Sequence, residues 1–268
     1  MSITFSTCWY NFKAKFDPSV YYQWIDNMLS NVNNYNLVIY CEYEGFKILE
    51  KYDDNPRIKI VIKPHNQFYT YRYRSEWILN HEKNDLLKTR VDWKLNMLWS
   101  EKIHFVYETM RNKYFDTCFY GWCDIGYFRG RPNDLTREQL VNWPNTNKIT
   151  LLDINKIYYA CVNNNNDYMN MLAHIVNNKN DLGLPETPIP PHQVSIAGGF
   201  FICHKSRVEW WRNTMDQKLA LYFKHGYLVK DDQIIVADCI LSDLDKFALC
   251  KEEDLRYDNW FLFQRLLL

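Results

Sequence analysis

The hydrophobic and polar positions in the first part of the chain predict alternating strands and helices. The runs of strand length are residues 3–8, 37–41 and 57–63. Asp17-Pro18 opens a segment whose apolar side chains recur at helical spacing, and proline is favoured in the first turn of a helix. Residues 44–52 suit a second, shorter helix. This β-α-β-α-β order predicts a mostly parallel sheet flanked by helices.

The rest of the pattern continues this alternation without an internal repeat or a domain boundary. Residues 64–90 are irregular and suit a helical insertion or a lid. Residues 91–113 form the clearest predicted helix, and it leads into an aromatic strand at 118–123. Later strands are predicted at 156–162, 194–204 and 247–250, and later helices at 167–177, 205–224 and 234–241. We therefore predict a single α/β domain over residues 1–268.

Asp124 stands alone at the end of the aromatic strand and is the first candidate for a functional residue. Gly126 and Arg129 follow it, so a flexible backbone position and a fixed cation lie close by in the sequence. An acid at the carboxyl end of a central strand lies where ligands bind in open α/β sheets. The pattern favours a metal or sugar-diphosphate site, and a solvated aspartate in a turn is the structural alternative.

Three further groups are candidates, each with a structural alternative. Gly198 and Gly199 fall inside the predicted strand 194–204, where paired glycines are costly unless a backbone or a ligand comes close. The other two groups are Arg90 with Lys94, and Asp231 with Asp232. The two cations lie one helical turn apart and share a face, as a surface ion-pairing patch also would. The two acids precede an apolar helix, where acids complement the helix dipole.

Composition and charge exclude some functions. The chain has 268 residues, with 47% hydrophobic and 17% aromatic residues, and a formal net charge of +0. A neutral chain without a basic block is a poor candidate for binding nucleic acid or a membrane surface. We find no signal peptide and no apolar run long enough to span a membrane. The 8 cysteines include no C-x-x-C pair, which is typical of reduced thiols, so we expect a cytoplasmic protein.

Several segments occur in one order: YYQWIDNMLSNVNNYNLVIYCE, WKLNMLWSEKI, YGWCDIGYFR, GGFFICHK and DDQIIVAD. In this order and spacing the chain resembles the HtrL/YibB family of predicted glycosyltransferases, which has bacterial and large-virus members. The resemblance covers nearly the whole chain at low identity. It implies a GT-A-like fold and the transfer of a sugar from a nucleotide-diphosphate sugar to a glycan or other hydroxyl acceptor. For a viral member, the location would be the host cytoplasm.

The resemblance also implies a metal ion. Asp124 resembles the acid that holds Mn²⁺ or Mg²⁺ against the two phosphates of the donor, and a hard cation there stabilises the departing diphosphate. The usual motif is D-x-D, whereas this chain has a single acid in Cys123-Asp124-Ile125-Gly126. A second ligand would then come from elsewhere in the chain, and the candidates are Asp231, Asp232, His204 and His225.

The remaining implied roles concern the donor and the acceptor. The implied donor-binding residues are Thr7, Tyr10, Arg90, Lys94, Arg129, Gly198 and Gly199. Thr7 and Tyr10 follow the first strand, where the nucleotide base lies in such folds, and Tyr10 has a ring that can stack on it. Asp232, or Asp231, resembles the acid beside the acceptor hydroxyl. It would be the general base of an inverting enzyme. In a retaining enzyme it would position the acceptor or stabilise positive charge on the sugar.

Two other classes of function stay open from the sequence. A non-catalytic nucleotide- or carbohydrate-binding protein on the same fold would explain the incomplete metal motif. A metal-dependent phosphoesterase would use Asp124 together with Asp231 and Asp232. A transferase would release nucleoside diphosphate from a nucleotide sugar, and a phosphoesterase would release phosphate from a simple ester. A binding protein would release neither.

Overall fold

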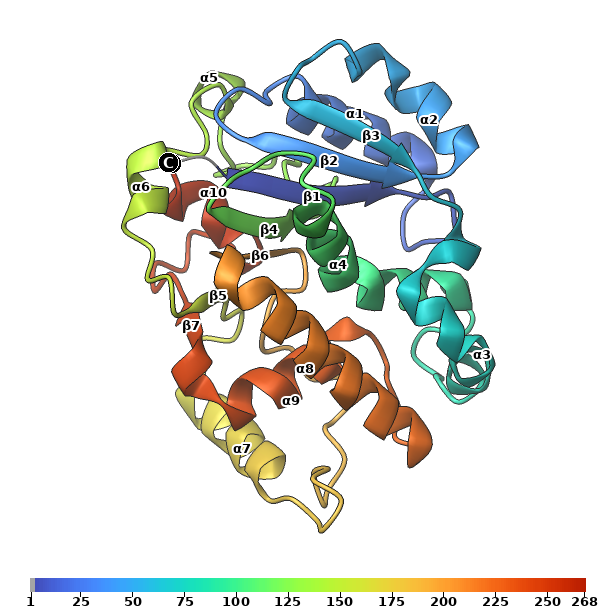
Figure 1. Ribbon diagram of the computed structural model, residues 1–268. Coiled ribbons are helices and arrows are strands. Elements are labelled where there is room, and N and C mark those ends of the chain that lie inside the picture. Colours follow the sequence, from blue (N-terminus) through green and yellow to red (C-terminus); the bar gives the residue numbers. More distant parts are fainter. Residues whose placement is uncertain (1–2) are drawn as a thin grey trace.

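The structure is a computed structural model that describes residues 3–268, and its centre is one seven-stranded sheet (Figure 1). The strand order across the sheet is β3-β2-β1-β4-β6-β5-β7. The strands are β1 (Ile3–Trp9), β2 (Asn36–Cys41), β3 (Ile58–Ile62), β4 (Phe119–Cys123), β5 (Ile157–Ala160), β6 (Phe200–His204) and β7 (Phe247–Cys250). Only β6 runs antiparallel to its neighbours β4 and β5. The predicted α/β class with a mostly parallel sheet is confirmed.

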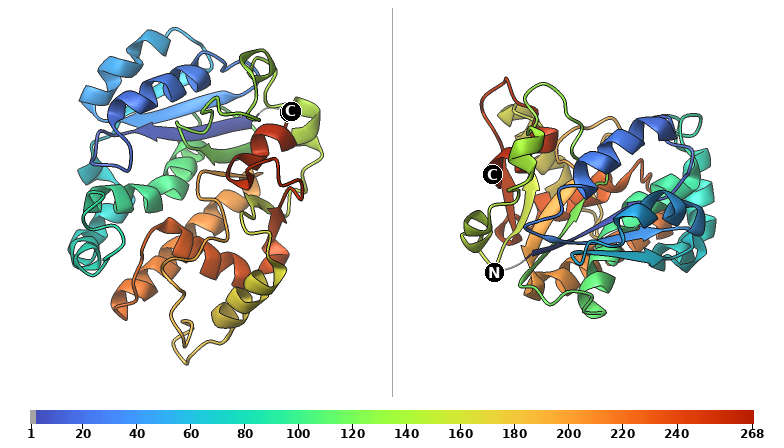
Figure 2. Two further views of the ribbon diagram at one scale, coloured as in Figure 1. Left: turned by 180° about the vertical axis from the view of Figure 1, so that it is seen from behind. Right: turned by 90° about the horizontal axis from the view of Figure 1, so that it is seen from above.

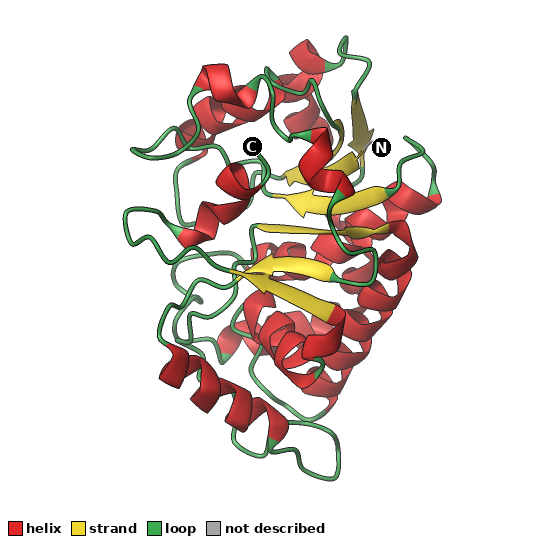
Figure 3. Ribbon diagram, turned by 90° about the vertical axis from the view of Figure 1, so that its left-hand side faces the viewer, coloured by secondary structure: helices red, strands yellow, loops and turns green. Residues whose placement is uncertain are grey.

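Helices cover both faces of the sheet, as the views in Figures 2 and 3 show. Alternate residues of the buried strand β2 serve the two cores, with Leu37 and Ile39 in one and Val38 and Tyr40 in the other. The first core also contains side chains from α1 (Pro18–Leu29), α2 (Tyr43–Leu49), α5 (Arg137–Leu140), α6 (Thr146–Thr150) and α10 (Leu262–Leu266). The second contains side chains from α3 (Arg74–Glu82), α4 (Trp93–Arg111), α7 (Asn166–Asn177), α8 (Lys205–Lys224) and α9 (Asp232–Ser242). A sheet buried on both faces explains why its strands read as continuous apolar runs.

The opening β-α-β-α-β prediction is confirmed, since β1 pairs with β2 and β2 with β3, each in parallel. Helix α1 begins at Pro18, and the side chain of Asp17 accepts a hydrogen bond from the backbone N–H of Ser19 at 2.9 Å. The irregular segment 64–90 contains two 3-10 helices, η2 (His65–Gln67) and η3 (Tyr69–Tyr73), before α3. The buried carboxylate of Glu101 fixes η3, because it accepts hydrogen bonds from the backbone N–H groups of Tyr69 and Thr70.

Two sequence-based boundaries are wrong, and both concern candidate residues. Strand β6 begins only at Phe200, so Gly198 and Gly199 precede the strand instead of lying inside it. The reason is that its partner β4 ends at Cys123, opposite Phe200. Helix α4 begins at Trp93, because the Asp92 side chain caps it by accepting a hydrogen bond from Lys94 N at 2.9 Å. Arg90 therefore lies before α4 and does not share a helical face with Lys94, although the sequence had suggested a shared face.

The sheet topology brings distant segments to one edge. Strand β1 lies between β2 and β4, and the chain proceeds to β2 on one side and later to β4 on the other. The carboxyl ends of β1 and β4 therefore meet where the strand order reverses, which is the usual place for a ligand in an open α/β sheet. Because β6 is antiparallel to β4, the residues before β6 lie beside the residue after β4. Asp124 N accordingly donates a hydrogen bond to Gly199 O at 2.8 Å.

Across residues 3–268, none of the helices combines the length and the apolar character needed to cross a membrane. All 8 cysteines are free thiols, and Cys41, Cys123, Cys161, Cys203 and Cys239 are buried.

Candidate active site

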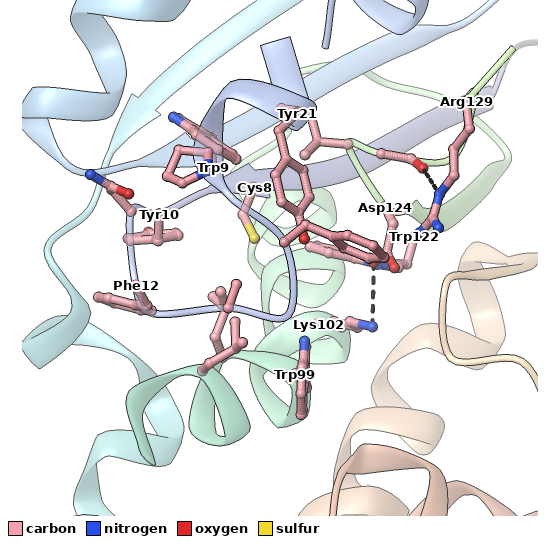
Figure 4. A pocket seen from close by; sticks show the side chains of 18 residues that line it. Cys8, Trp9, Tyr10, Phe12, Tyr21, Trp99, Lys102, Trp122, Asp124 and Arg129 are labelled. Carbon is pink, nitrogen blue, oxygen red and sulfur yellow. Dashed lines mark hydrogen bonds and ion pairs between the residues drawn. The ribbon is translucent and has the colours of Figure 1, made fainter. Parts of the chain in front are cut away.

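A two-part cleft lies at the carboxyl ends of β1 and β4. Its narrow part, about 130 Å³, is rich in aromatic rings, which come from Trp9, Tyr10, Phe12, Phe16, Tyr21, Trp99 and Trp122 (Figure 4). Its wide part, about 370 Å³, carries most of the charge, from Lys15, Lys102, Asp124, Arg129, Arg131, Asp231, Asp232 and Asp258. Trp99, Lys102, Asp124 and Arg129 line both parts, so the two form one continuous cleft. Its size suits a small-molecule ligand, for which pockets of about 300–1,000 Å³ are usual.

Lys102 connects three segments at the centre of the cleft. Its Nζ lies 3.3 Å from Asp124 Oδ1 and 3.3 Å from Asp232 Oδ2, and it donates a hydrogen bond to Gly198 O at 2.8 Å. These partners come from the end of β4, the start of α9 and the segment before β6. Only 11% of the lysine side chain is exposed. One buried ammonium thus holds two carboxylates in place beside a glycine carbonyl.

The electrostatics of this cluster raise the pKa of one acid, Asp232, toward neutral pH. Burial alone would lower the pKa of Lys102, but the carboxylates of Asp124 and Asp232 more than offset this, so its pKa is raised and it stays a cation. Burial raises the pKa of Asp232 to about 6, although Lys102 opposes that change, and the nearby charges of Asp231 and Asp124 add to it. Asp232 is therefore an ionised carboxylate at neutral pH that can readily take up a proton.

Asp231 lies next to this cluster and is held differently. Its Oδ2 lies 2.7 Å from Lys230 Nζ, and its Oδ1 is buried without a hydrogen-bond partner among residues 3–268. It occupies the N-cap position of α9, yet its side chain makes no capping hydrogen bond. A capping hydrogen bond therefore does not account for Asp231, although the place of both acids at the start of α9 suits the helix dipole, as the sequence suggested.

Three buried asparagines place the start of α9. Asn80 exchanges two hydrogen bonds with the backbone of Val229, and Asn96 donates to the carbonyls of Val229 and Lys230. Asn84 also donates to Lys230 O, at 2.9 Å. These asparagines belong to α4 and to the segment around α3, so side chains far away in the sequence fix the backbone just before the two acids.

Gly198 and Gly199 each border one carboxylate. A Cβ atom on Gly198 would lie 3.1 Å from Asp232 Oδ2, and one on Gly199 would lie 3.1 Å from Asp124 Oδ2. Both distances are shorter than ordinary contacts, so a side chain at either position would press on an acid of the cleft. The paired glycines of the sequence are explained by this close approach.

Asp124 and Arg129 line both parts of the cleft (Figure 4). Trp122 Nε1 donates to Asp124 Oδ1 at 2.5 Å, while Oδ2 has no hydrogen-bond partner in the part of the chain that the structure describes. The Asp124 side chain is 42% exposed. The Arg129 guanidinium lies 4.4 Å from the centre of a Trp24 ring, and its Nε donates to Gly126 O at 3.1 Å. No carboxylate of residues 3–268 forms an ion pair with Arg129, so this cation is fixed and available to an anion.

The residues around Asp124 do not form a resident metal site. Residues 3–268 contain no group of three or more His, Cys, Asp or Glu side chains placed to hold a metal ion. The Lys102 ammonium lies between Asp124 and Asp232, in the position that a metal ion shared by the two carboxylates would need. His204 is at the other end of β6, opposite Phe119, and His225 does not line the cleft. The use of Mn²⁺ or Mg²⁺ stays a prediction, with Asp124 Oδ2 as the oxygen open to an ion.

The structure brings together some of the predicted site residues and places others elsewhere. Asp124, Arg129, Asp231, Asp232, Gly198 and Gly199 line the wide part of the cleft. Tyr10 lines the narrow part, with its hydroxyl donating to Lys63 O and its ring packed on Phe68 and Phe105. Thr7, Arg90 and Lys94 are not among the residues that line the cleft. Thr7 was expected to follow the first strand, but β1 extends to Trp9, so Thr7 lies inside the strand and is fully buried. Arg90 is exposed.

Sequence reasoning missed Lys102, although a signal was present. Leu95, Leu98 and Lys102 are spaced by three and four residues, so the lysine falls on the apolar face of α4. A lysine on an apolar face needs a partner, because a buried charge is costly unless it is paired. Trp99, on the same helix, was also missed as a residue that lines both parts of the cleft.

Comparisons with known proteins add little to this geometry. No protein-family model matches the sequence, and no curated protein matches it. One solved structure that matches is mouse xyloside xylosyltransferase 1 in its apo form, with 12% sequence identity and a TM-score of 0.46. The match covers 93% of this chain and 85% of that chain. A likeness at this level does not decide a function, so the assignment rests on the cleft itself.

Proposed function

We propose that this protein is a glycosyltransferase of the HtrL/YibB type, which moves a sugar from a nucleotide-diphosphate sugar to a glycan or other hydroxyl acceptor in the cytoplasm. The observation that carries the proposal is the pairing of Asp124 and Asp232 through Lys102, at the junction of an aromatic and a charged part of one cleft. This arrangement suits a nucleoside, a sugar diphosphate and an acceptor hydroxyl in neighbouring parts of the cleft.

The aromatic part of the cleft suits the nucleoside and the charged part suits the diphosphate and sugar. Rings such as Trp99 can stack on a base or a sugar. The Arg129 guanidinium has no ion-pair partner among residues 3–268, so it can form charge-assisted hydrogen bonds to the phosphate oxygens of a diphosphate. As the bond to the sugar breaks, negative charge grows on the diphosphate, and a cation fixed in advance stabilises it at no cost in reorganisation.

Asp232 suits the acceptor side of the reaction. Its carboxylate lies at the start of α9, beside Gly198, with a pKa raised to about 6 by burial. A general base works best when its pKa lies near the operating pH. In an inverting reaction Asp232 would take the proton of the acceptor hydroxyl as the oxygen attacks the sugar carbon, while the diphosphate leaves with the bonding electrons. In a retaining reaction it would hold the acceptor or stabilise positive charge on the sugar.

The deciding experiment measures nucleotide-sugar turnover with a panel of donors, each with and without Mn²⁺. Slow release of free nucleoside diphosphate in the absence of acceptor supports the transferase. Binding of a donor without release under any acceptor supports the non-catalytic alternative, and release of phosphate from simple esters supports a phosphoesterase. The transferase proposal fails if no nucleotide sugar binds or is turned over.

A further inference from the structure

We infer that Lys102 is the built-in cation of this site: its ammonium takes the place between Asp124 and Asp232 that a bridging divalent ion would occupy, so the protein without substrate binds no such ion there. The inference rests on the proposed function only for its meaning in catalysis. Its evidence is the arrangement of the three side chains.

The first argument is geometric. Lys102 Nζ is 3.3 Å from one oxygen of each carboxylate, and it also donates to Gly198 O at 2.8 Å. A divalent ion binds carboxylate oxygens at about 2.0–2.6 Å, so an ion that bridged the pair would need the space that the ammonium fills. The lysine cannot easily move aside, because its side chain is only 11% exposed and it comes from the buried face of α4.

The second argument is the balance of charge. The cluster contains the carboxylates of the partly exposed Asp124 and of the buried Asp231 and Asp232. Lys102 lies beside Asp124 and Asp232, and Lys230 lies beside Asp231, so the three acids and two ammonium groups leave one net negative charge. Each carboxylate therefore has a cationic partner in the folded chain. Two carboxylates that shared the site without Lys102 would repel each other and would need another cation between them. Lys102 thus meets the need that a resident metal ion meets in other acidic sites.

The arrangement leaves one route open to a metal ion. Asp124 Oδ2 has no hydrogen-bond partner in residues 3–268 and its side chain is 42% exposed. An ion that arrives already bound to the phosphates of a donor is therefore not blocked, whereas an ion held by both acids is. Lys102 is a positioning residue in this account, because it holds the two acids at a fixed separation.

The test is a Mn²⁺ titration of the full-length protein, followed by the paramagnetic resonance signal of free Mn²⁺. We expect the wild type to take up no Mn²⁺ below about 1 mM. Lys102→Met removes the ammonium and keeps much of the volume, so we expect it to gain one Mn²⁺ site at least tenfold tighter than any in the wild type. Adding Asp124→Asn to Lys102→Met should abolish that site. Lys148→Met, an exposed lysine of α6, is the matched control and should gain none.

The inference is overturned if the wild type binds one Mn²⁺ tightly, or if a folded Lys102→Met binds no more tightly than the wild type. Should Lys102→Met fail to fold, Lys102→Gln takes its place. The wild-type titration still tests whether the unmodified protein binds Mn²⁺. Calorimetry of nucleotide-sugar binding in chelator, on the same wild-type protein, separates the two proposals. Absence of donor binding overturns the transferase assignment and leaves the Mn²⁺ result unaffected.

Discussion

Asp232→Asn is the sharpest test of the site, because it separates catalysis from stability. The substitution keeps the shape of the side chain and its oxygen toward Lys102, but it removes the negative charge. An amide cannot accept the proton of an acceptor hydroxyl, so we expect turnover to fall by about 10²–10⁴-fold. Donor affinity should stay near that of the wild type, because Asp232 faces the acceptor side of the cleft in our proposal.

Whereas turnover should fall, the stability of Asp232→Asn should be unchanged or raised. The pKa of Asp232 rises from an ordinary 3.8 to about 6 in the folded protein. Each unit of pKa is worth about 1.4 kcal/mol, so keeping this buried group ionised costs the folded state about 2–3 kcal/mol at neutral pH. The unfolded chain loses the proton first, so this cost appears as the pH rises from about 4 to about 6 and is complete above that range. Asparagine carries no such cost.

We therefore expect the free energy of unfolding of Asp232→Asn at pH 7.5 to be unchanged or higher than that of the wild type, by up to about 2 kcal/mol. Its dependence on pH between 4 and 7 should be weaker. The measurements are urea unfolding at several pH values and release of nucleoside diphosphate. Asp167→Asn is the matched control, because Asp167 is an exposed acid in the first turn of α7, and it should leave turnover unchanged.

Two results would refute this reasoning. If Asp232→Asn keeps full turnover, the acid has no part in the chemistry. If the wild type does not lose stability relative to Asp232→Asn as the pH rises from about 4 to about 6, then the pKa of Asp232 is not raised in the folded protein.

Three further predictions concern the other residues of the cleft. Asp124→Asn should lower turnover strongly, as measured by diphosphate release, and wild-type activity would contradict a role of Asp124 at the donor. Its melting temperature, measured by calorimetry, should stay within a few degrees of the wild type, because Lys102 keeps two other partners. Arg129→Met should weaken donor binding by about 1.5–3 kcal/mol, the value of a charge-assisted hydrogen bond, whereas Lys94→Met should change affinity less than twofold in the same calorimetric titration. Gly199→Ala should lower turnover about tenfold or more, since its new Cβ would lie 3.1 Å from Asp124 Oδ2, and an unchanged rate would mean that the acid yields without consequence.

The sequence was sufficient for the order of elements and for several residues of the cleft. Continuous apolar runs and helix-start signals gave the strands and helices, and Asp124, the two glycines and Asp231-Asp232 all line one cleft as the order of motifs suggested. These features are local, so a single segment carries enough information to show them.

The residues that the sequence could not place depend on contacts between segments. The antiparallel direction of β6 decides that Gly199 meets Asp124, and no local pattern shows that direction. Arg90 and Lys94 were favoured because they share a polar face, yet the cleft uses the apolar face of α4, where Lys102 lies. The asparagines that fix the start of α9 read as ordinary polar residues until their carbonyl partners are known.

The late arrival of β6 has a consequence for synthesis of the chain. Strand β4 is an inner strand whose partner on one side, β1, is made first, but its other edge pairs with β6, which follows about 80 residues later. At roughly 5–20 residues per second, a ribosome leaves that edge unpaired for several seconds to about a quarter of a minute. The strand is the aromatic run Phe119–Cys123, and an unpaired apolar edge of this kind invites pairing with another chain. Slower elongation downstream of β4 should therefore raise the aggregated fraction of newly made protein, and a chaperone that shields strand edges should lower it.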